Sequence, residues 1–384
     1  MIESPFLALP GAVPADGTDA GVPAHYGNPL VEQRRLEAGR AVVDLSNRGV
    51  VTVSGPDRLT WLHSMASQAL ARLAPGESAE ALLLDANGHI EHVAHVLDDG
   101  ASTWLIVEGP DAAVLAAFLD RMRFMLRVEV ADVSSEWAVL AGMGTDALDL
   151  ATPARVVNGV ALDWVDPWRT AHGHQYARES GHPAGDWRWV ERLIPREQLA
   201  EAAAAVAAGR VDAAGVLAAE ALRIAAWRPR QATEVDEKAI PHELDWLRSA
   251  VDLGKGCYKG QETVAKVLNL GRPPRRLVLL HLDGSDTVLP APGETVVGEK
   301  LRPDAADGAA PERRDVGRIT ASAMHHELGP IALAVVKRAV PGDLPLIVES
   351  HGIDVAAAQV EIVPADAGAA VDVPRLPRLG VRRP

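Results

Sequence analysis

The first third of the chain alternates helical and extended patterns of apolar residues. Apolar positions recur every three to four residues in three stretches, which predict amphipathic helices over 28–38, 57–70 and 110–124. Runs rich in β-branched residues predict strands over 41–45, 50–54, 81–84, 89–97, 104–107 and 128–130. Asn87-Gly88 predicts a hairpin between two of these strands, because both residues tolerate a positive φ. Elements in this order predict an α+β lobe with an antiparallel sheet over 25–135.

The pattern of apolar residues and the local composition divide the remaining chain into a second lobe, a β-rich segment and two irregular ends. Strands and Ala-rich helices predict a second α+β lobe over 136–270. Short strands separated by Pro and Gly turns then predict a small antiparallel barrel or sandwich over 271–365. Residues 1–24 are rich in Pro, Gly, Ala and Asp and predict a flexible lead-in. Pro and Arg residues predict a disordered tail over 366–384.

Composition narrows the class of protein and its partners. With 384 residues, 48% hydrophobic and 23% charged, the chain is typical of a soluble protein of two or three domains. A net charge of −14 makes its general surface unsuited to nucleic acid or to an anionic membrane. No apolar run approaches the roughly 18 residues of a membrane helix. The first residues also lack the basic region of a secretory signal.

Cysteine and tryptophan usage adds two further constraints. One cysteine, Cys257, excludes an intrachain disulfide and a multi-cysteine zinc or cluster site within one chain. Together with the absent secretory signal, this predicts a cytoplasmic protein. Nine Trp stand against three Tyr and three Phe. Each Trp brings a large contact area and one N–H donor, so both core packing and a ligand pocket remain open as their roles.

The stretch from Leu253 to Lys266 contains the candidate chemistry, with three glycines in seven residues around Cys257. Lys255 and Lys259 flank the cysteine at two residues on either side, and nearby cations favour the thiolate if the sulfur is exposed. Over 248–276, seven Lys or Arg and two Asp or Glu give a balance of +5 in an acidic chain. This local charge predicts an anionic small ligand or an acidic patch on a partner. The alternative is that Cys257 is a buried apolar filler, the commonest role of a free cysteine.

The pattern Lys-Gly-Cys-Tyr-x-Gly-Gln-Glu resembles the signature of the YgfZ-type proteins, relatives of mitochondrial Iba57 within the glycine-cleavage T-protein superfamily. The resemblance covers about residues 25–365. Its matching segments are His25-Tyr26-Gly27, Val43-Asp44-Leu45-Ser46, Leu84 to Ile90, Leu222-Arg223-Ile224, Val316 to Thr320 and Ile331 to Ala334. It implies a three-lobed fold, in which two ferredoxin-like α+β lobes and a C-terminal antiparallel β-barrel surround a central channel.

The resemblance also implies a function and a set of site residues. Members of the YgfZ branch assist the maturation or repair of [4Fe-4S] enzymes through the motif cysteine, so the expected partners are such enzymes or assembly proteins. Cys257 would act as a thiolate, with transient cluster ligation among its roles, and no permanently bound metal is expected. The other motif residues expected to act with it are Lys255, Tyr258, Gln261 and Glu262. Tetrahydrofolate or a one-carbon derivative is the expected cofactor, with contacts from Asp85, Asn87, Glu91, Arg223, Gly256, Lys259 and Gly260.

Two departures distinguish this chain from the aminomethyltransferase T proteins. Those proteins usually carry an acidic pair after the hairpin glycine, where this chain has Glu91-His92. They also place a pterin-binding glutamate where this chain has Ala225, so the pterin donors need another acceptor, for which Glu220 is one helical turn away. Three hypotheses follow: an iron–sulfur accessory protein acting through Cys257, a tetrahydrofolate-dependent one-carbon transferase, and a folate-binding module without chemistry.

Overall fold

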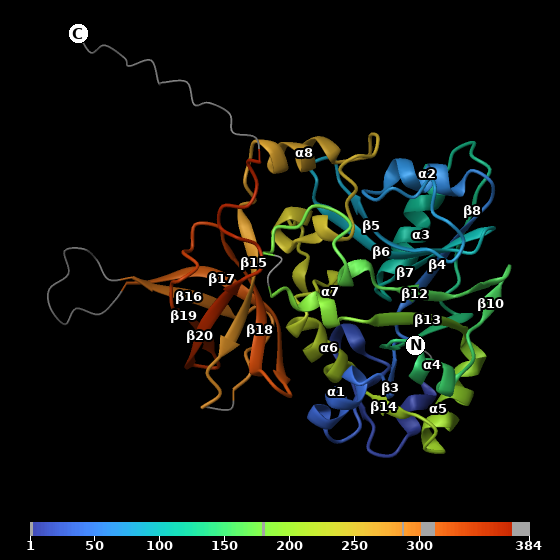
Figure 1. The fold of residues 1–384 in the computed structure, drawn as a ribbon, viewed down its shortest axis with the longest axis horizontal. Coiled ribbons are helices and arrows are strands. Elements are labelled where there is room, and N and C mark those ends of the chain that lie inside the picture. The colour runs from blue at the N-terminus through green and yellow to red at the C-terminus, as the bar shows by residue number, and fades with distance from the viewer. Residues whose placement is uncertain (1–2, 179–180, 286–287, 301–311, 371–384) are drawn as a thin grey trace, which may run out of the picture.

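The computed structural model describes residues 3–178, 181–285, 288–300 and 312–370. Two α+β lobes lie side by side, and a β-barrel stands beside them (Figure 1). The predicted α+β fold with a closed C-terminal barrel is confirmed.

The first lobe is a five-stranded antiparallel sheet of order β5-β6-β7-β4-β8. Two helices, α2 and α3, pack on one face, where the interior is lined by aliphatic residues such as Val51, Leu83 and Leu115. The predicted Asn-Gly turn joins β5 to β6, and Gly88 has φ 83°. The elements of this lobe are β4 (Gly49–Ser54), α2 (Arg58–Met65), β5 (Ser78–Leu84), β6 (Ile90–Asp98), β7 (Ser102–Val107), α3 (Asp111–Met122) and β8 (Glu129–Asp132).

The second lobe has a five-stranded sheet of order β12-β13-β9-β3-β14, covered by helices on both faces. Its strand β3 comes from the segment that was predicted to belong to the first lobe, and it pairs with β9 and, in parallel, with β14. The sheets therefore do not follow the predicted boundary at residue 135. The elements are α1 (Pro29–Glu37), β3 (Ala41–Asp44), β9 (Trp137–Met143), α4 (Asp146–Ala151), β10 (Val156–Val157), β11 (Val160–Ala161), β12 (Asp163–Val165), η3 (Pro167–Arg169), η4 (Pro183–Asp186), β13 (Trp189–Pro195), η5 (Arg196–Gln198), α5 (Leu199–Ala207), β14 (Asp212–Ala214) and α6 (Val216–Ala225).

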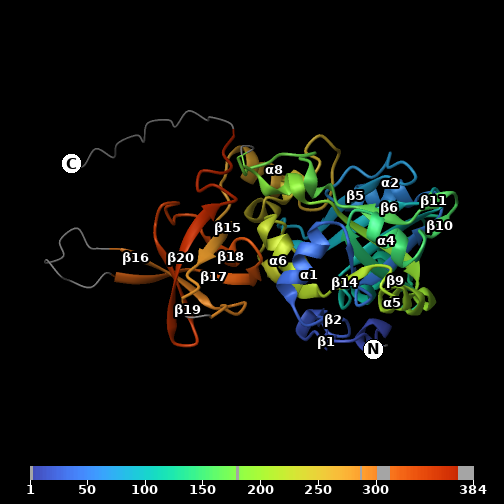
Figure 2. The same cartoon turned by 60° about the horizontal axis from the view of Figure 1, so that its bottom comes forward.

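A connecting segment leads from the second lobe to the barrel and contains the motif. It consists of α7 (Gln231–Glu234), η6 (Pro241–Leu244), η7 (Trp246–Arg248) and α8 (Gln261–Asn269). The six-stranded closed barrel follows in the order β15-β18-β17-β16-β19-β20. Its strands are β15 (Arg275–Leu282), β16 (Thr295–Lys300), β17 (Glu312–His325), β18 (Gly329–Lys337), β19 (Leu346–Ser350) and β20 (Ile353–Glu361). Helices α1 and α6 lie between the barrel and the second lobe, and α6 contacts β17 (Figure 2).

The N-terminal segment, predicted to be a flexible lead-in, is folded onto the second lobe from residue 3. It forms η1 (Pro5–Ala8), β1 (Val13–Pro14), η2 (Gly17–Asp19) and β2 (Pro23–His25). The Phe6 ring is fully buried, and the Ser4 hydroxyl donates to Asp44. The prediction of a flexible lead-in was wrong because buried contacts such as those of Phe6 and Ser4 fix a segment that is otherwise rich in turn-forming residues.

Part of the predicted disordered tail is also ordered. Ala367 is buried, and the Ala370 backbone N–H donates to the Leu268 carbonyl at 2.9 Å. Residues 371–384 lie outside the described residues. The described end of the chain therefore packs against α8, the helix that follows the motif.

Candidate functional site

Cys257 lies in the loop between η7 and α8, and its side chain is exposed. The motif glycine Gly260 begins α8 as its N-cap residue with φ 85°. Glu262 lies in the first turn of this helix, where a carboxylate is favourable because the helix dipole is positive there. The loop thus presents the single thiol to solvent, and the buried-filler alternative is wrong.

Lys255 points away from solvent and fixes the loop to the first lobe. Its ammonium donates to the carbonyls of His63 and Ala66 at the end of α2, and to the Gln68 carbonyl at 3.1 Å. It also lies 4.9 Å from the centre of the Tyr258 ring, which is buried beneath the loop. Burial lowers the pKa of Lys255 to about 8. Its hydrogen bonds anchor the loop, which is a different task from the predicted one of favouring the thiolate.

The remaining polar motif residues make contacts on the surface. Lys259 pairs with Glu91 at 3.1 Å, and both side chains are more than a third exposed. Its ammonium lies 6.0 Å from the Phe118 ring centre on α3. Gln261 Nε2 donates to the Lys255 carbonyl at 3.4 Å, which closes the loop on itself. The motif therefore touches both α2 and α3 of the first lobe.

The β5–β6 hairpin lies directly against the motif. A Cβ atom on Gly260 would come within 2.7 Å of the Asp85 carbonyl oxygen. Asp85 accepts hydrogen bonds from the backbone of Asn87 and His89, both at 2.8 Å, and from His89 Nδ1 at 3.0 Å. Burial alone would raise the pKa of Asp85, but these hydrogen bonds lower it below its ordinary value. This carboxylate shapes the turn that receives the motif.

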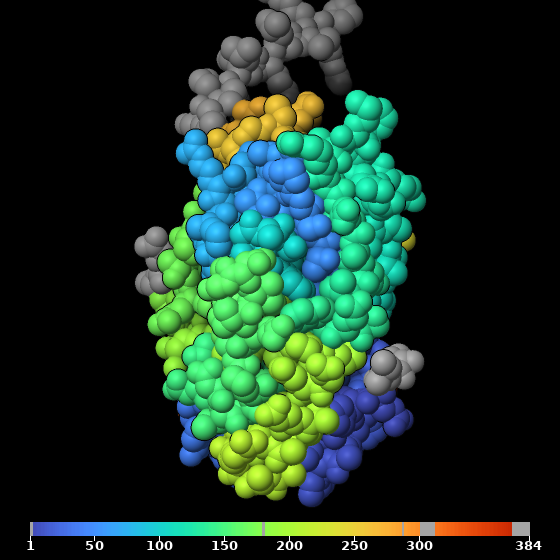
Figure 3. All heavy atoms as spheres, turned by 90° about the vertical axis from the view of Figure 1, so that its right-hand side faces the viewer, coloured from blue at the N-terminus to red at the C-terminus, as the bar shows by residue number. Residues whose placement is uncertain are grey.

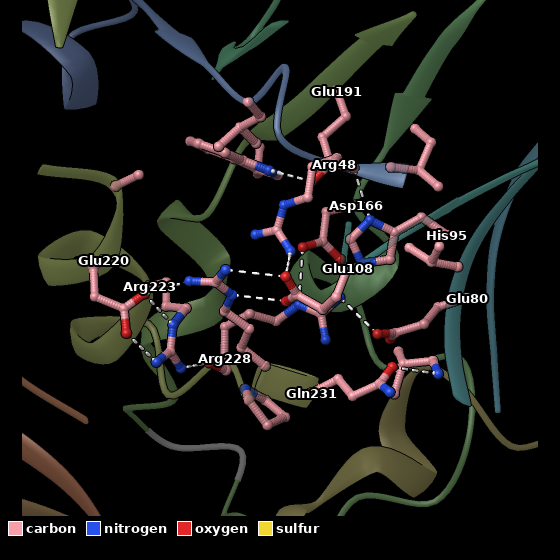
Figure 4. A pocket seen from close by; sticks show the side chains of 18 of the residues that line it. Arg48, Glu80, His95, Glu108, Asp166, Glu191, Glu220, Arg223, Arg228 and Gln231 are labelled. Carbon is pink, nitrogen blue, oxygen red and sulfur yellow. Dashed lines mark hydrogen bonds and ion pairs between the residues drawn. The ribbon is translucent and has the colours of Figure 1, made fainter. Parts of the chain in front are cut away.

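A separate cavity of about 90 Å³ lies between the two α+β lobes (Figure 4). Three Trp side chains contribute to its walls, and Trp187 and Trp189 stack with ring centres 5.2 Å apart. His95 stacks on Trp164 at 3.8 Å and pairs with Glu191 at 2.8 Å. The charged and amide residues of the lining are Asp19, Arg48, Glu80, His95, Glu108, Asp166, Glu191, Glu220, Arg223, Arg228, Arg230 and Gln231.

Ion pairs connect most of these charges across long sequence separations. Arg230 binds Asp19 at 2.8 Å and Glu108 at 2.8 Å, so it joins the N-terminal segment to the first lobe. Arg48 also pairs with Glu108. Burial would raise the pKa of Glu108, but these two guanidinium groups hold it well below its ordinary value. Glu108 is therefore ionised at neutral pH.

Arg228 forms a second, deeper group of ion pairs. It binds Glu80 at 2.7 Å and Asp166 at 2.9 Å. Each of these carboxylates also accepts from an indole N–H, Glu80 from Trp246 at 2.9 Å and Asp166 from Trp187 at 2.8 Å. The aromatic walls are thus held in place by buried charges.

Among the described residues, two N–H groups of the lining side chains are buried without a protein partner, Arg48 Nε and Arg228 Nη1. Unpaired buried donors are costly, and a ligand with acceptor atoms would relieve that cost. A pterin offers a flat ring for the Trp walls and a carbonyl oxygen for such donors. The aromatic walls and the two free donors therefore suit a pterin ring, although the lining was only partly predicted.

The structure divides the predicted folate contacts between two places. Arg223 lines the cavity, where it pairs with Glu234 at 2.9 Å and with Glu220. The other six predicted contacts gather where the hairpin meets the motif: Asp85, Asn87, Glu91, Gly256, Lys259 and Gly260. Most cavity residues were missed, and some of them, such as Glu80 on β5 and Glu191 on β13, are single charged residues on apolar strands. An isolated charge within a buried strand is the sequence signal that could have found them.

Comparisons with known proteins agree with this architecture. Residues 12–170 match the family model of the GCVT N-terminal domain. A mitochondrial iron-sulfur cluster assembly factor, an IBA57 homologue of Cryptococcus neoformans, is 26% identical over 260 residues, which are 64% of this chain and 67% of that protein. An aminomethyltransferase of Moorella thermoacetica is 26% identical over 332 residues, 82% of this chain and 83% of that one.

Two further comparisons concern a plant relative and a solved structure. An Arabidopsis thaliana protein described as a chloroplastic transferase is 24% identical over 295 residues, and the match spans 74% of this chain but only 65% of that protein. The crystal structure of the glycine cleavage system aminomethyltransferase T from Bartonella henselae superimposes with a TM-score of 0.70 at 20% identity, covering 94% of this chain and 96% of that one. This last likeness shows the fold.

Family model, relatives and fold together support the assignment of this chain to the T-protein-like superfamily. The similarity to IBA57 homologues supports the IBA57/YgfZ type that the motif predicted.

Two observations concern the described residues only. No helix there is long and apolar enough to cross a membrane. Nor do those residues contain a group of three or more His, Cys, Asp or Glu side chains placed to hold a metal ion.

Proposed function

We propose that this protein assists the maturation or repair of [4Fe-4S] enzymes and acts through Cys257. The observation that carries the proposal is the presentation of the single thiol, which is exposed on a loop anchored at both ends. Lys255 holds one end to α2, and Gly260 packs the other end against the β5–β6 hairpin. The similarity to IBA57 assembly factors supports the same role. We place this action in the cytoplasm, as the single cysteine predicts.

Cys257 would act as a thiolate toward a cluster or toward a partner's thiol. One thiolate fills only one of the four protein ligand positions of a [4Fe-4S] cluster. The partner enzymes or assembly proteins would therefore supply the other ligands. The exposed, anchored loop suits such a shared role, since it brings the sulfur to a partner without unfolding.

The central cavity is the proposed folate site. Trp187 and Trp189 would hold the pterin ring, and Arg48 and Arg228 would donate to its acceptor atoms. Glu220 lines the same cavity and offers a carboxylate near the position of Ala225. When bound, tetrahydrofolate supplies a carrier for one-carbon units. The chain's own part is to bind and orient the ring and to exclude water with the lobes on either side.

The proposal is tested by the activity of a [4Fe-4S] dehydratase in cells that lack this protein. Cells are complemented with wild type or Cys257→Ser at matched expression, and melting temperature verifies the fold of each. Rescue by wild type alone supports the thiol role. Because the chain has one cysteine, alkylation of the purified wild type should reproduce the serine variant in a reconstitution assay. Equal rescue by both proteins would refute the thiol role.

A tetrahydrofolate-dependent one-carbon transferase is the second candidate. It is supported by the similarity to aminomethyltransferases over 82% of the chain and by the cavity itself. Against it, Glu91 is held by Lys259 at the surface, where the transferase role predicts an active carboxylate. Turnover of an aminomethyl donor that survives Cys257→Ala would favour this second function.

A further inference from the structure

An apolar surface runs along the outer side of α3 and the loop that follows it. Val114, Phe118 and Met122 are spaced by four residues, so they share one face of the helix. Contiguous exposed apolar surface of this kind marks interaction sites. Its exposed members form what we call the α3 patch: Val114 (57% exposed), Met122 (51%), Phe124 (89%), Met125 (82%) and Leu126 (41%).

The loop that ends the patch is held in one conformation. Phe124 has φ 44°, a left-handed conformation that is uncommon for a bulky residue. The loop is fixed by Arg127, which donates to Asp57 through its backbone N–H at 2.9 Å and through its guanidinium at 3.0 and 2.6 Å. A conformation of this sort persists only where the surrounding structure fixes it. The fold thus presents an aromatic side chain to solvent, and the Arg127–Asp57 ion pair holds the loop that carries it.

The helix face that bears the patch reaches the motif through Phe118. The Phe118 ring contacts Lys259, with 6.0 Å between the ammonium and the ring centre, and Lys259 lies two residues after Cys257. Helices α2, α3 and α8 share one side of the molecule, where the α8 segment borders the first lobe (Figure 3). A partner seated on the patch would therefore lie next to the thiol.

We propose that the α3 patch docks the apo form of a [4Fe-4S] protein, so that the ligands of its cluster site face Cys257. This inference rests on the proposed function. A single thiol needs further ligands from a second protein, and that protein must be held beside it. Phe and Met are enriched in the buried cores of protein interfaces, with charged residues at the rim, as Arg121, Arg123 and Lys259 are here. Aromatic anchors supply most of the affinity of such contacts.

The test uses the full chain and a purified apo-dehydratase, the same [4Fe-4S] enzyme that serves in the rescue assay. The patch variant is Phe124→Ser with Met125→Ser. Its matched control is Leu150→Ser with Val156→Ser, two apolar residues that are 55% and 57% exposed on the second lobe. The patch variant should bind the apo-enzyme about tenfold more weakly, while the control binds as wild type does. Melting temperature and the rate of Cys257 alkylation should be equal in all three proteins.

Each other outcome is decisive. Unchanged binding by the patch variant would overturn the docking role. The docking role would also be overturned if the apo-enzyme does not bind and the wild type instead forms a dimer that the patch mutations dissociate. The same holds if the apo-enzyme does not bind and the wild type instead binds phosphatidylglycerol vesicles, a binding that the patch variant loses. Cys257→Ser should keep binding and lose rescue. Full rescue by Cys257→Ser would refute the thiol role alone, because binding of the apo-enzyme still decides whether the patch docks it.

Discussion

Gly260 of the motif packs directly against Gly88 of the β5–β6 hairpin. A Cβ on Gly260 would lie 3.0 Å from the Gly88 Cα and 2.7 Å from the Asp85 carbonyl, and Gly260 itself has φ 85°. The two segments were predicted separately, one as a turn and one as the chemical motif. Their contact sets the position of the loop that carries Cys257.

The first prediction concerns this contact. Gly260→Ala should lower the free energy of unfolding by about 1–3 kcal/mol, since the new methyl group meets backbone atoms at a positive φ. Gly256→Ala is the matched control, because its Cβ would meet no atom within 4 Å. Urea denaturation of both variants measures the difference. Equal stability of the two variants would show that the β5–β6 hairpin shifts to accommodate the new methyl group and that the contact is not tight.

The second prediction separates the two lysines that flank Cys257. Lys255→Met removes the donor to three backbone carbonyls at the end of α2 and should cost about 1–3 kcal/mol. Lys259→Met removes an exposed ion pair and should cost less than about 1 kcal/mol. Thermal or urea unfolding distinguishes them. A larger effect at Lys259 would contradict the anchoring role of Lys255.

The third prediction uses the pH dependence of stability. Asp245 is buried between η6 and η7, and burial raises its pKa to about 7, although it accepts hydrogen bonds from the backbone of Tyr176 and Ala177. The folded protein therefore binds this proton more tightly than the unfolded chain does. Between about pH 4 and pH 7, the Asp245 contribution to the free energy of unfolding falls as pH rises.

Asp245→Asn removes this titration while keeping an oxygen acceptor and a residue type that tolerates the observed φ of 56°. The stability of the variant relative to wild type should therefore increase from pH 4 to pH 7, by about 1.4 kcal/mol for each unit of pKa shift. Urea titrations at several pH values measure the difference. A difference that does not change with pH would mean that Asp245 is ionised throughout.

The fourth prediction tests the cavity as a folate site. Ala219 on α6 lines the cavity, so Ala219→Phe should fill it and weaken tetrahydrofolate binding at least about tenfold. Leu217→Phe is the control, because Leu217 lies on the same helix and is 47% exposed. Quenching of Trp fluorescence by added tetrahydrofolate measures binding, since Trp187 and Trp189 form the wall. Equal quenching in the two variants would place folate elsewhere.

The sequence by itself determined the local elements and the place of the motif. The turn at Asn87-Gly88 and most strands of the barrel follow from residue spacing and turn chemistry, whereas helix α8 and strand β20 were not predicted. The predicted features depend on neighbours within a few residues, so the pattern of one sequence contains them. The family motif added the three-lobed arrangement.

Only the tertiary structure decided which distant residues meet. Strand β3 joins the second sheet, and the cavity gathers side chains from Asp19 to Trp246, with Arg230 and Asp19 separated by 211 positions. Lys255 was expected beside the thiol, but its ammonium binds the end of α2. Such contacts depend on packing, burial and long-range ion pairs, and a charged residue on a strand does not by itself indicate its partner. The cavity and the anchoring of Cys257 are therefore properties of the folded chain.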